Sequence, residues 1–290
     1  HNGLSAVLGC IVGNDTLTAV AEFSYDYVNG YVDAQGNPQG SEDPLYKIYK
    51  ITEGNTTSED YLTWPVNQGA YTDSLGQPLN LGTQTMFYVY TDAYPHASGS
   101  TSLQSLKAQV LQTNWAYNVN GPLGNIVFQE YRVINKSTNV WTQTYLAQWT
   151  DDDLGNSTDD KVGVDTSLNL GYTYNATNND GIYGAAPPAV GFDFFRGALV
   201  ASPGDTVRYY SPPGSNNLVV KPNFRLHGKQ LRGETEFSKN RKYRVFAYFW
   251  RLQSVVNHSR WTNKHALQGQ FGRRVARCTV ECNQIFGSSQ

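Results

Sequence analysis

Several segments of this chain alternate apolar and polar residues with a period of two, and this pattern constrains the fold more than any other feature. Across residues 17–27, apolar side chains occupy nearly every second position, with polar residues between them. The same alternation recurs across residues 141–149 and 168–174. Successive side chains of a β-strand point to opposite faces of a sheet, so these segments predict strands with one buried and one solvated face.

Other segments extend this prediction to most of the chain. Residues 125–134 are apolar on both faces, which favours a more central strand, and residues 86–91 and 106–117 are further strand candidates. The polar connection 135–139 predicts a hairpin between residues 125–134 and the strand that starts at Trp141. Because the 20 Tyr, 12 Phe and 6 Trp favour strands and the 27 Gly favour turns, the composition agrees with this pattern. We therefore predict a mainly β protein with sandwich-like antiparallel sheets and long turn-rich loops.

The chain divides into two parts of different composition near Phe224. Residues 225–290 hold 13 of the 22 Lys and Arg but only 3 of the 24 Asp and Glu, and they contain no Pro and no Asp. We expect residues 1–224 to form a β-rich extracellular region and residues 225–290 to be a basic, poorly defined tail that is out of frame or disordered. The first residues are expected to continue from a longer protein, because no initiating Met or signal peptide is present. We find no internal repeat.

Aspartates crowd one region between Trp149 and Gly197, where only Lys161 and Arg196 offset eight carboxylates. Crowded carboxylates repel one another unless they are solvated, protonated or bridged by a cation, and Ca²⁺ takes about six to eight oxygen ligands from loops of this kind. Calcium is therefore a candidate cofactor. The candidate ligands are Asp151, Asp153, Asp159, Asp160, Asp165 and Asp180. The alternative is a set of ordinary turns in which Asp and Asn side chains bind their own backbone, and the EF-hand pattern is not met because Ala176 occupies its first ligand position.

Catalytic interpretations have weaker support, and enzyme activity is not expected. A glycosidase needs two carboxyl groups flanking the bond that is cleaved. The acidic candidates for such a pair are Asp151, Asp153, Glu130 and Asp193. The chain has no G-x-S-x-G or H-E-x-x-H motif, and His96 lies in a turn-like stretch where a solvent-exposed histidine is expected. Aromatic side chains could form a platform for sugar rings; we expect Trp141 and Trp149 in the core and Trp64 to be more open.

The region of residues 15–222 resembles a family of large secreted proteins from bacteria of the Bacteroidetes, Chlorobi and Ignavibacteria type, which often end in a type IX secretion sorting tail. The matching stretches are YKIYKI (46–51), DYLTWPVNQGA (60–70), GNIVFQEYRVINK (124–136), WTDDDLG (149–155), DDKVGVDTSLNLGYTYN (159–175) and YGAAPPAVGFDFFRG (183–197). The resemblance implies export and an extracellular or cell-surface location. It names no catalytic residue.

These observations lead to an expected function. We expect a structural or adhesive module of a larger secreted bacterial surface protein that calcium could stabilise. The alternative is a module that binds or degrades polysaccharide with acidic loop residues and exposed aromatics. The expected partners are other domains of the same polypeptide and extracellular polysaccharide. Nucleic acid is not expected, and no run of about 18 apolar residues predicts a membrane span.

Overall fold

The structure is a computed structural model, and its strands account for most of the residues that it describes. It describes residues 3–20, 26–96, 102–165, 167–168, 170–196, 199–210, 218–226, 250–252 and 278–288. The strands are β1 (Gly3–Val12), β2 (Asp15–Val20), β3 (Val28–Asn29), β4 (Tyr31–Val32), β5 (Pro38–Gln39), β6 (Tyr49–Thr52), β7 (Gln84–Thr91), β8 (Ala108–Ala116), β9 (Ile126–Asn135), β10 (Trp141–Asp151), β11 (Asp160–Asp165), β12 (Leu170–Asn175), β13 (Asn179–Asp180), β14 (Gly184–Ala185), β15 (Pro188–Arg196), β16 (Leu199–Tyr210), β17 (Leu218–Leu226), β18 (Trp250–Leu252) and β19 (Cys278–Ser288). The short helical segments are α1 (Glu59–Leu62), η1 (Val66–Gln68) and η2 (Pro122–Asn125). None of the helices in these ranges has the length and apolar character that a membrane span requires.

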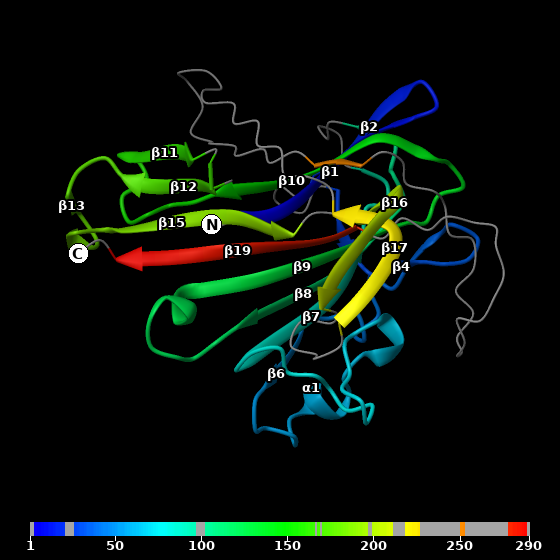
Figure 1. The fold of residues 1–290 in the computed structure, drawn as a ribbon, viewed down its shortest axis with the longest axis horizontal. Coiled ribbons are helices and arrows are strands. Elements are labelled where there is room, and N and C mark those ends of the chain that lie inside the picture. Colours follow the sequence, from blue (N-terminus) through cyan, green and yellow to red (C-terminus); the bar gives the residue numbers. More distant parts are fainter. Residues whose placement is uncertain are drawn as a thin grey trace.

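The strands form antiparallel sheets of different sizes, as Figure 1 shows. The larger sheet has the order β11-β12-β15-β19-β9-β8-β7-β3, and β6 also pairs with β7. A smaller sheet has the order β18-β10-β1-β2. The pairs β4–β5, β13–β14 and β16–β17 form two-stranded sheets. The prediction of a mainly β protein with antiparallel sheets is confirmed.

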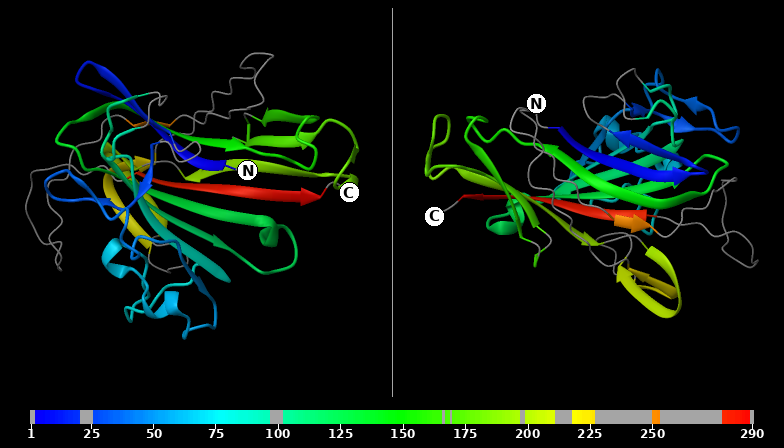
Figure 2. Two further views of the ribbon diagram at one scale, coloured as in Figure 1. Left: turned by 180° about the vertical axis from the view of Figure 1, so that it is seen from behind. Right: turned by 90° about the horizontal axis from the view of Figure 1, so that it is seen from above.

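The main hydrophobic core lies between the two larger sheets, which face each other in two layers (Figure 2). The smaller sheet contributes Leu8, Leu17 and Trp141, and the larger sheet contributes Tyr131 and Phe192. Leu17 and Ala19 are buried with polar neighbours between them, as the alternation predicts. Trp141 is also buried as predicted, whereas the side chain of Trp149 lies outside the described part of the structure.

A second core lies on the opposite face of β7 and β8, against α1 and η1. It contains Tyr49, Ile51, Trp64, Ala70, Phe87, Val89 and Leu111. Trp64 is only 7% exposed, and its indole Nε1 donates a hydrogen bond to the carbonyl oxygen of Tyr71 at 2.9 Å. The expectation of an open Trp64 is therefore wrong. The turn that carries Trp64 folds over the sheet, because burying its large ring against Tyr49 and Phe87 is favourable.

The predicted hairpin around residues 135–139 is also wrong. β9 pairs with β8 and β19, whereas β10 pairs with β1 and β18, so the connection crosses from one sheet to the other. The Asn135 side chain holds this turn by donating to the carbonyl oxygen of Asn139 and accepting from the N–H of Ser137. Both strands have a strongly apolar face, and stacking these faces buries them in one core, which edge-to-edge pairing would not do.

Several strands come from segments for which the sequence predicted no strand, and β1 and β19 are among them. The apolar stretch at the N-terminal end forms β1, which pairs with β2 and β10. Within residues 225–290, the structure describes the end of β17, β18 and β19, and β19 lies between β9 and β15 in the larger sheet. The division of the chain at residue 224 stays a prediction.

Candidate functional site

The aspartates proposed as calcium ligands are distributed over several turns, and most of the described carboxyl groups bind backbone N–H groups. Asp160 is buried at the start of β11, and its Oδ2 accepts a hydrogen bond from the N–H of Leu154 at 3.0 Å. Asp165 ends the same strand and accepts from the N–H groups of Ser167 and Leu168. The Ser167 hydroxyl, followed by these N–H groups, lowers the pKa of Asp165. These two residues close their own loops.

Asp180 joins two loops. Its Oδ1 accepts from the N–H groups of Ile182 and Tyr183, both at 2.7 Å, and its Oδ2 accepts from the N–H of Asn156 at 3.0 Å. These bonds, the one from Tyr183 first, lower the pKa of Asp180. Gly155 makes the approach possible, because a Cβ at this residue would lie 2.2 Å from Asp180 Oδ1 and its φ is +70°.

The other proposed ligands do not join a common centre in the described structure. Asp153 is exposed, Asp159 is partly buried, and the side chain of Asp151 lies outside the described part. Among the described residues, no group of three or more His, Cys, Asp and Glu side chains is arranged to hold a metal ion. Of the proposed ligands, Asp160, Asp165 and Asp180 therefore hold turns, and Asp153 faces solvent.

One of the acidic residues considered for glycoside cleavage, Glu130, has structural contacts. Glu130 lies on β9 and is only 1% exposed. Its Oε1 accepts a short hydrogen bond from the hydroxyl of Tyr71 and lies 3.6 Å from Nε of Arg132. The guanidinium of Arg132 lies 4.6 Å from the centre of the Tyr71 ring and donates to the carbonyl oxygen of Gly69. This cluster attaches the segment after η1 to the large sheet.

His96 is buried, so the expectation of a solvent-exposed loop histidine is wrong. Its side chain has 0% exposure and lies between Asp26 and Asp92, with ring nitrogens 3.5 Å and 3.4 Å from their carboxylate oxygens. Nδ1 lies 2.6 Å from the carbonyl oxygen of Ser102, and Nε2 lies 3.0 Å from that of Asp92. Because a carbonyl oxygen can only accept, both nitrogens must carry hydrogen, and the ring is an imidazolium. The contact with the Asp92 carboxylate is the main cause that raises the pKa of His96 from 6.5 to about 9.

This buried cluster fixes the loop that follows β7. The two oxygens of Asp92 accept from the N–H groups of Leu106 and Ala108, both at 2.6 Å, and Asp26 accepts from the N–H of Val20 at 2.7 Å. Cys10 lies close enough for the Asp92 charge to act on it. Burial first, and then this charge, raises the pKa of the Cys10 thiol to about 12, so the thiol stays protonated and is a poor nucleophile.

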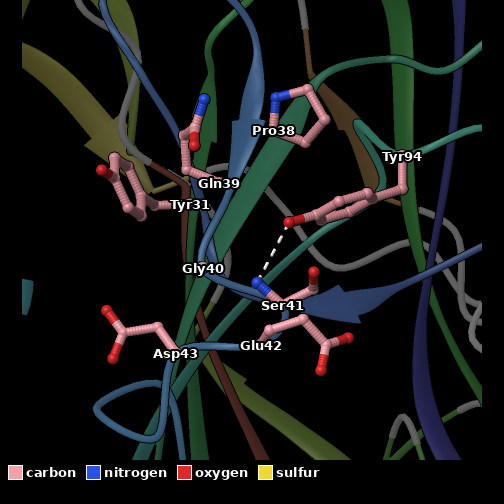
Figure 3. Close-up of a pocket in the computed structure, with 8 residues that line it drawn as sticks. All are labelled: Tyr31, Pro38, Gln39, Gly40, Ser41, Glu42, Asp43 and Tyr94. Atoms are coloured by element: carbon pink, nitrogen blue, oxygen red, sulfur yellow. Dashed lines mark hydrogen bonds between the residues drawn. The ribbon is translucent and has the colours of Figure 1, made fainter.

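An open hollow of about 460 Å³ lies beside this loop (Figure 3). It is lined by Tyr31, Pro38, Gln39, Gly40, Ser41, Glu42, Asp43 and Tyr94. Figure 3 shows the rings of Tyr31 and Tyr94 on either side of the backbone at Gly40, with the carboxyl groups of Glu42 and Asp43 below it in this view. The lining thus combines two aromatic rings, an amide, a hydroxyl and two acidic groups.

The walls of the hollow are fixed by hydrogen bonds from several elements. The N–H of Ser41 donates to the hydroxyl of Tyr94 at 3.1 Å, as the dashed line in Figure 3 shows. The side chain of Asn29 donates to the carbonyl oxygens of Ser41 and Tyr46. Gly40 has a φ of +91°, and a Cβ there would lie 2.8 Å from the Tyr46 ring, so this close turn requires glycine. The ring of Tyr46 stacks on Tyr31 with centroids 5.2 Å apart.

The hairpin that carries Tyr31 has a second copy in the chain, so the expectation of no internal repeat is wrong for this short motif. Residues 31–38 read YVDAQGNP and residues 71–78 read YTDSLGQP. In both copies the aspartate Oδ1 accepts from the N–H groups two and four residues later, at Asp33 and at Asp73. These bonds, that from Asn37 first, lower the pKa of Asp33. The shared pattern Tyr-x-Asp-x-x-Gly-x-Pro is the sequence signal that could have located the hollow.

Comparison of the chain with protein-family models, with curated proteins and with solved structures found no match.

Proposed function

We propose that this chain is a structural or adhesive module of a larger secreted bacterial surface protein. The observation that supports this most directly is how the aspartate carboxyl groups are used. Asp160, Asp165 and Asp180 bind backbone N–H groups and so hold the long loops at the ends of the strands. Carboxyl groups used in this way stabilise the loop conformation.

The hollow gives this module a surface on which a ligand can bind. The hairpin that lines the hollow is attached to the large sheet by two side chains. The Oε1 of Gln109 accepts from the N–H of Val32 at 3.0 Å, and the Nζ of Lys107 donates to the carbonyl oxygen of Gly36 at 2.8 Å. A binding surface whose walls are already fixed loses little conformational entropy when the ligand binds. The tyrosines and polar groups that line the hollow are suited to binding extracellular polysaccharide.

The test is retention without cleavage. The purified chain is mixed with a panel of insoluble polysaccharides, and protein in the pellet and new reducing ends in the supernatant are both measured. We expect retention on at least one polysaccharide with no new reducing ends. Reducing ends that disappear with Asp153→Asn or Glu130→Gln would show an enzyme instead, and absence of retention on the whole panel would overturn the adhesive function.

Removal of calcium distinguishes the two interpretations of the aspartate-rich loops. We propose that these loops are self-sufficient turns, because Asp160, Asp165 and Asp180 already have N–H partners. A chelator such as EGTA should then leave the melting temperature of the chain unchanged, as measured by circular dichroism. A fall in the melting temperature that added Ca²⁺ reverses, and that Asp153→Asn abolishes, would establish calcium as a stabilising ligand.

A further inference from the structure

We propose that the hollow between Tyr31 and Tyr94 binds a pyranose ring that carries a protonated amine, as in a polysaccharide of glucosamine. This inference rests on the proposed adhesive function and names the class of ligand for that site.

The size and the lining of the hollow suit a sugar ring. A volume of about 460 Å³ falls within the range of sites for small ligands, which is about 300–1,000 Å³. A pyranose has apolar C–H faces and hydroxyl groups at its edge. The rings of Tyr31 and Tyr94 offer flat apolar surfaces for those faces, and Gln39 and Ser41 offer hydrogen-bonding groups for the edge.

The charge of the lining selects among sugars. Glu42 and Asp43 both line the hollow, and none of the residues that line it is basic. The Asp43 side chain also accepts from the N–H of Leu45, whereas no backbone N–H of the described residues is bonded to the Glu42 side chain at the rim. Two carboxylates repel an acidic sugar and attract a cationic one, and the tyrosine faces attract a cation as well.

The second copy of the hairpin shows this chemistry inside the protein. There, the ring of Tyr71 lies 4.6 Å from the guanidinium of Arg132, and the carboxyl group of Glu130 contacts both residues. The first copy places its tyrosine, Tyr31, on the wall of a hollow with two carboxylates. In the second copy, tyrosine and carboxylate bind a cation that the chain itself supplies. We infer that the first copy binds a cation supplied by the ligand.

The site is already formed before a ligand binds. The ring of Tyr31 is held by stacking on Tyr46, and the hydroxyl of Tyr94 is held by the N–H of Ser41. Tyr94 also lies between Asp92 and His96, whose buried contacts fix this loop. A cationic pyranose can therefore enter without rearrangement of the backbone.

The test is titration calorimetry of the whole chain with three oligosaccharides at about pH 6, where a sugar amine is protonated. The three probes are tetramers of glucosamine, of N-acetylglucosamine and of galacturonic acid. We expect the glucosamine tetramer to bind about fivefold more tightly than the acetylated one, and the acidic one to bind least. Raising the ionic strength should weaken only the binding of the glucosamine tetramer.

Variants locate the site. Glu42→Gln should weaken the binding of the glucosamine tetramer about three- to fivefold and leave that of the acetylated tetramer nearly unchanged. Tyr31→Ala should weaken both about tenfold, and Tyr31→Phe should retain binding because the ring is kept. The matched controls are Glu53→Gln and Tyr183→Ala, since both residues are exposed and neither lines the hollow. Both controls should bind like the parent chain.

Two results would overturn this inference. Unchanged affinity in both Glu42→Gln and Tyr31→Ala would place the sugar elsewhere, while retention on polysaccharide would still support the adhesive module. Tighter binding of a lysine- and arginine-rich peptide that also depends on Glu42 and Tyr31 would identify the ligand as a basic protein segment. Failure of the proposed function is a separate outcome, because it would appear as cleavage or as no retention in the polysaccharide panel.

Discussion

Replacement of Asp92 by alanine is expected to lower the free energy of unfolding by about 3–5 kcal/mol, as breaking a buried ion pair does when one partner is removed. The carboxyl group is fully buried and accepts from the N–H groups of Leu106 and Ala108. It also lies 3.4 Å from the ring of His96. Its loss leaves two N–H groups without their acceptor and the imidazolium with one carboxylate fewer. Equilibrium unfolding in urea, followed by tryptophan fluorescence, measures the change.

Two variants control for this prediction. Asp92→Asn keeps the shape of the side chain and one acceptor oxygen, so it should cost less than the alanine variant. Asp165→Ala removes an aspartate that also accepts backbone N–H groups, but in an exposed turn, and should cost much less than Asp92→Ala. Equal losses in Asp92→Ala and Asp165→Ala would contradict the role given to the buried cluster.

The loss of Asp92 should also weaken ligand binding in the hollow. Tyr94 lies two residues after Asp92 and two before His96, and its hydroxyl accepts from the N–H of Ser41. A loop that loses its buried anchor no longer holds this ring in one position, so the entropy cost of binding increases. The structure thus connects the buried charges with the wall of the proposed ligand site.

The sequence predicted several of the longer strands because their evidence is local. A period of two identifies a strand with one buried face whatever its partner is, and β7, β8, β9 and β12 all lie where the alternation or the apolar runs placed them. The partner of a strand depends on contacts distant in the sequence. The turn after Asn135 therefore resembles a hairpin locally, although β9 and β10 lie in different sheets. Tyr131 of β9 and Trp141 of β10 are buried in the same core between the two sheets, and this packing places the two strands in opposite layers.

The candidate site was harder to predict for the same reason. The aspartate-rich region stands out in the sequence, yet the carboxyl groups of Asp160, Asp165 and Asp180 bind N–H groups of neighbouring turns, which composition alone does not distinguish from metal ligands. The hollow joins Tyr31 with Tyr94, residues far apart in the sequence, through a hydrogen bond at Ser41. His96 was expected in solvent because its neighbours resemble a turn, but Asp92, four residues earlier, and Asp26, from a distant part of the chain, make its burial favourable.

The buried imidazolium also predicts how stability depends on pH. The pKa of His96 in the folded protein is about 9, above its ordinary value of 6.5, so the folded state binds this proton more tightly than the unfolded state. The stabilisation is therefore fully present below about pH 6.5 and is lost as the pH rises through about 9. A shift of this size corresponds to about 3 kcal/mol of unfolding free energy.

Urea unfolding at a series of pH values between about 6 and 9.5 tests this prediction, with His96→Gln as the comparison. The groups that face the ring or act on its cluster are Asp26 and Asp92, together with Cys10 and Tyr27. Burial raises the pKa of Cys10 to about 12 and that of Tyr27 well above its ordinary value, so in the folded state both stay protonated throughout this range. The parent chain should lose stability steeply over this range, and His96→Gln should be less stable at low pH with a much flatter profile. Parallel profiles for the two proteins would show that His96 is neutral in the fold, and the two carbonyl contacts would then need another explanation.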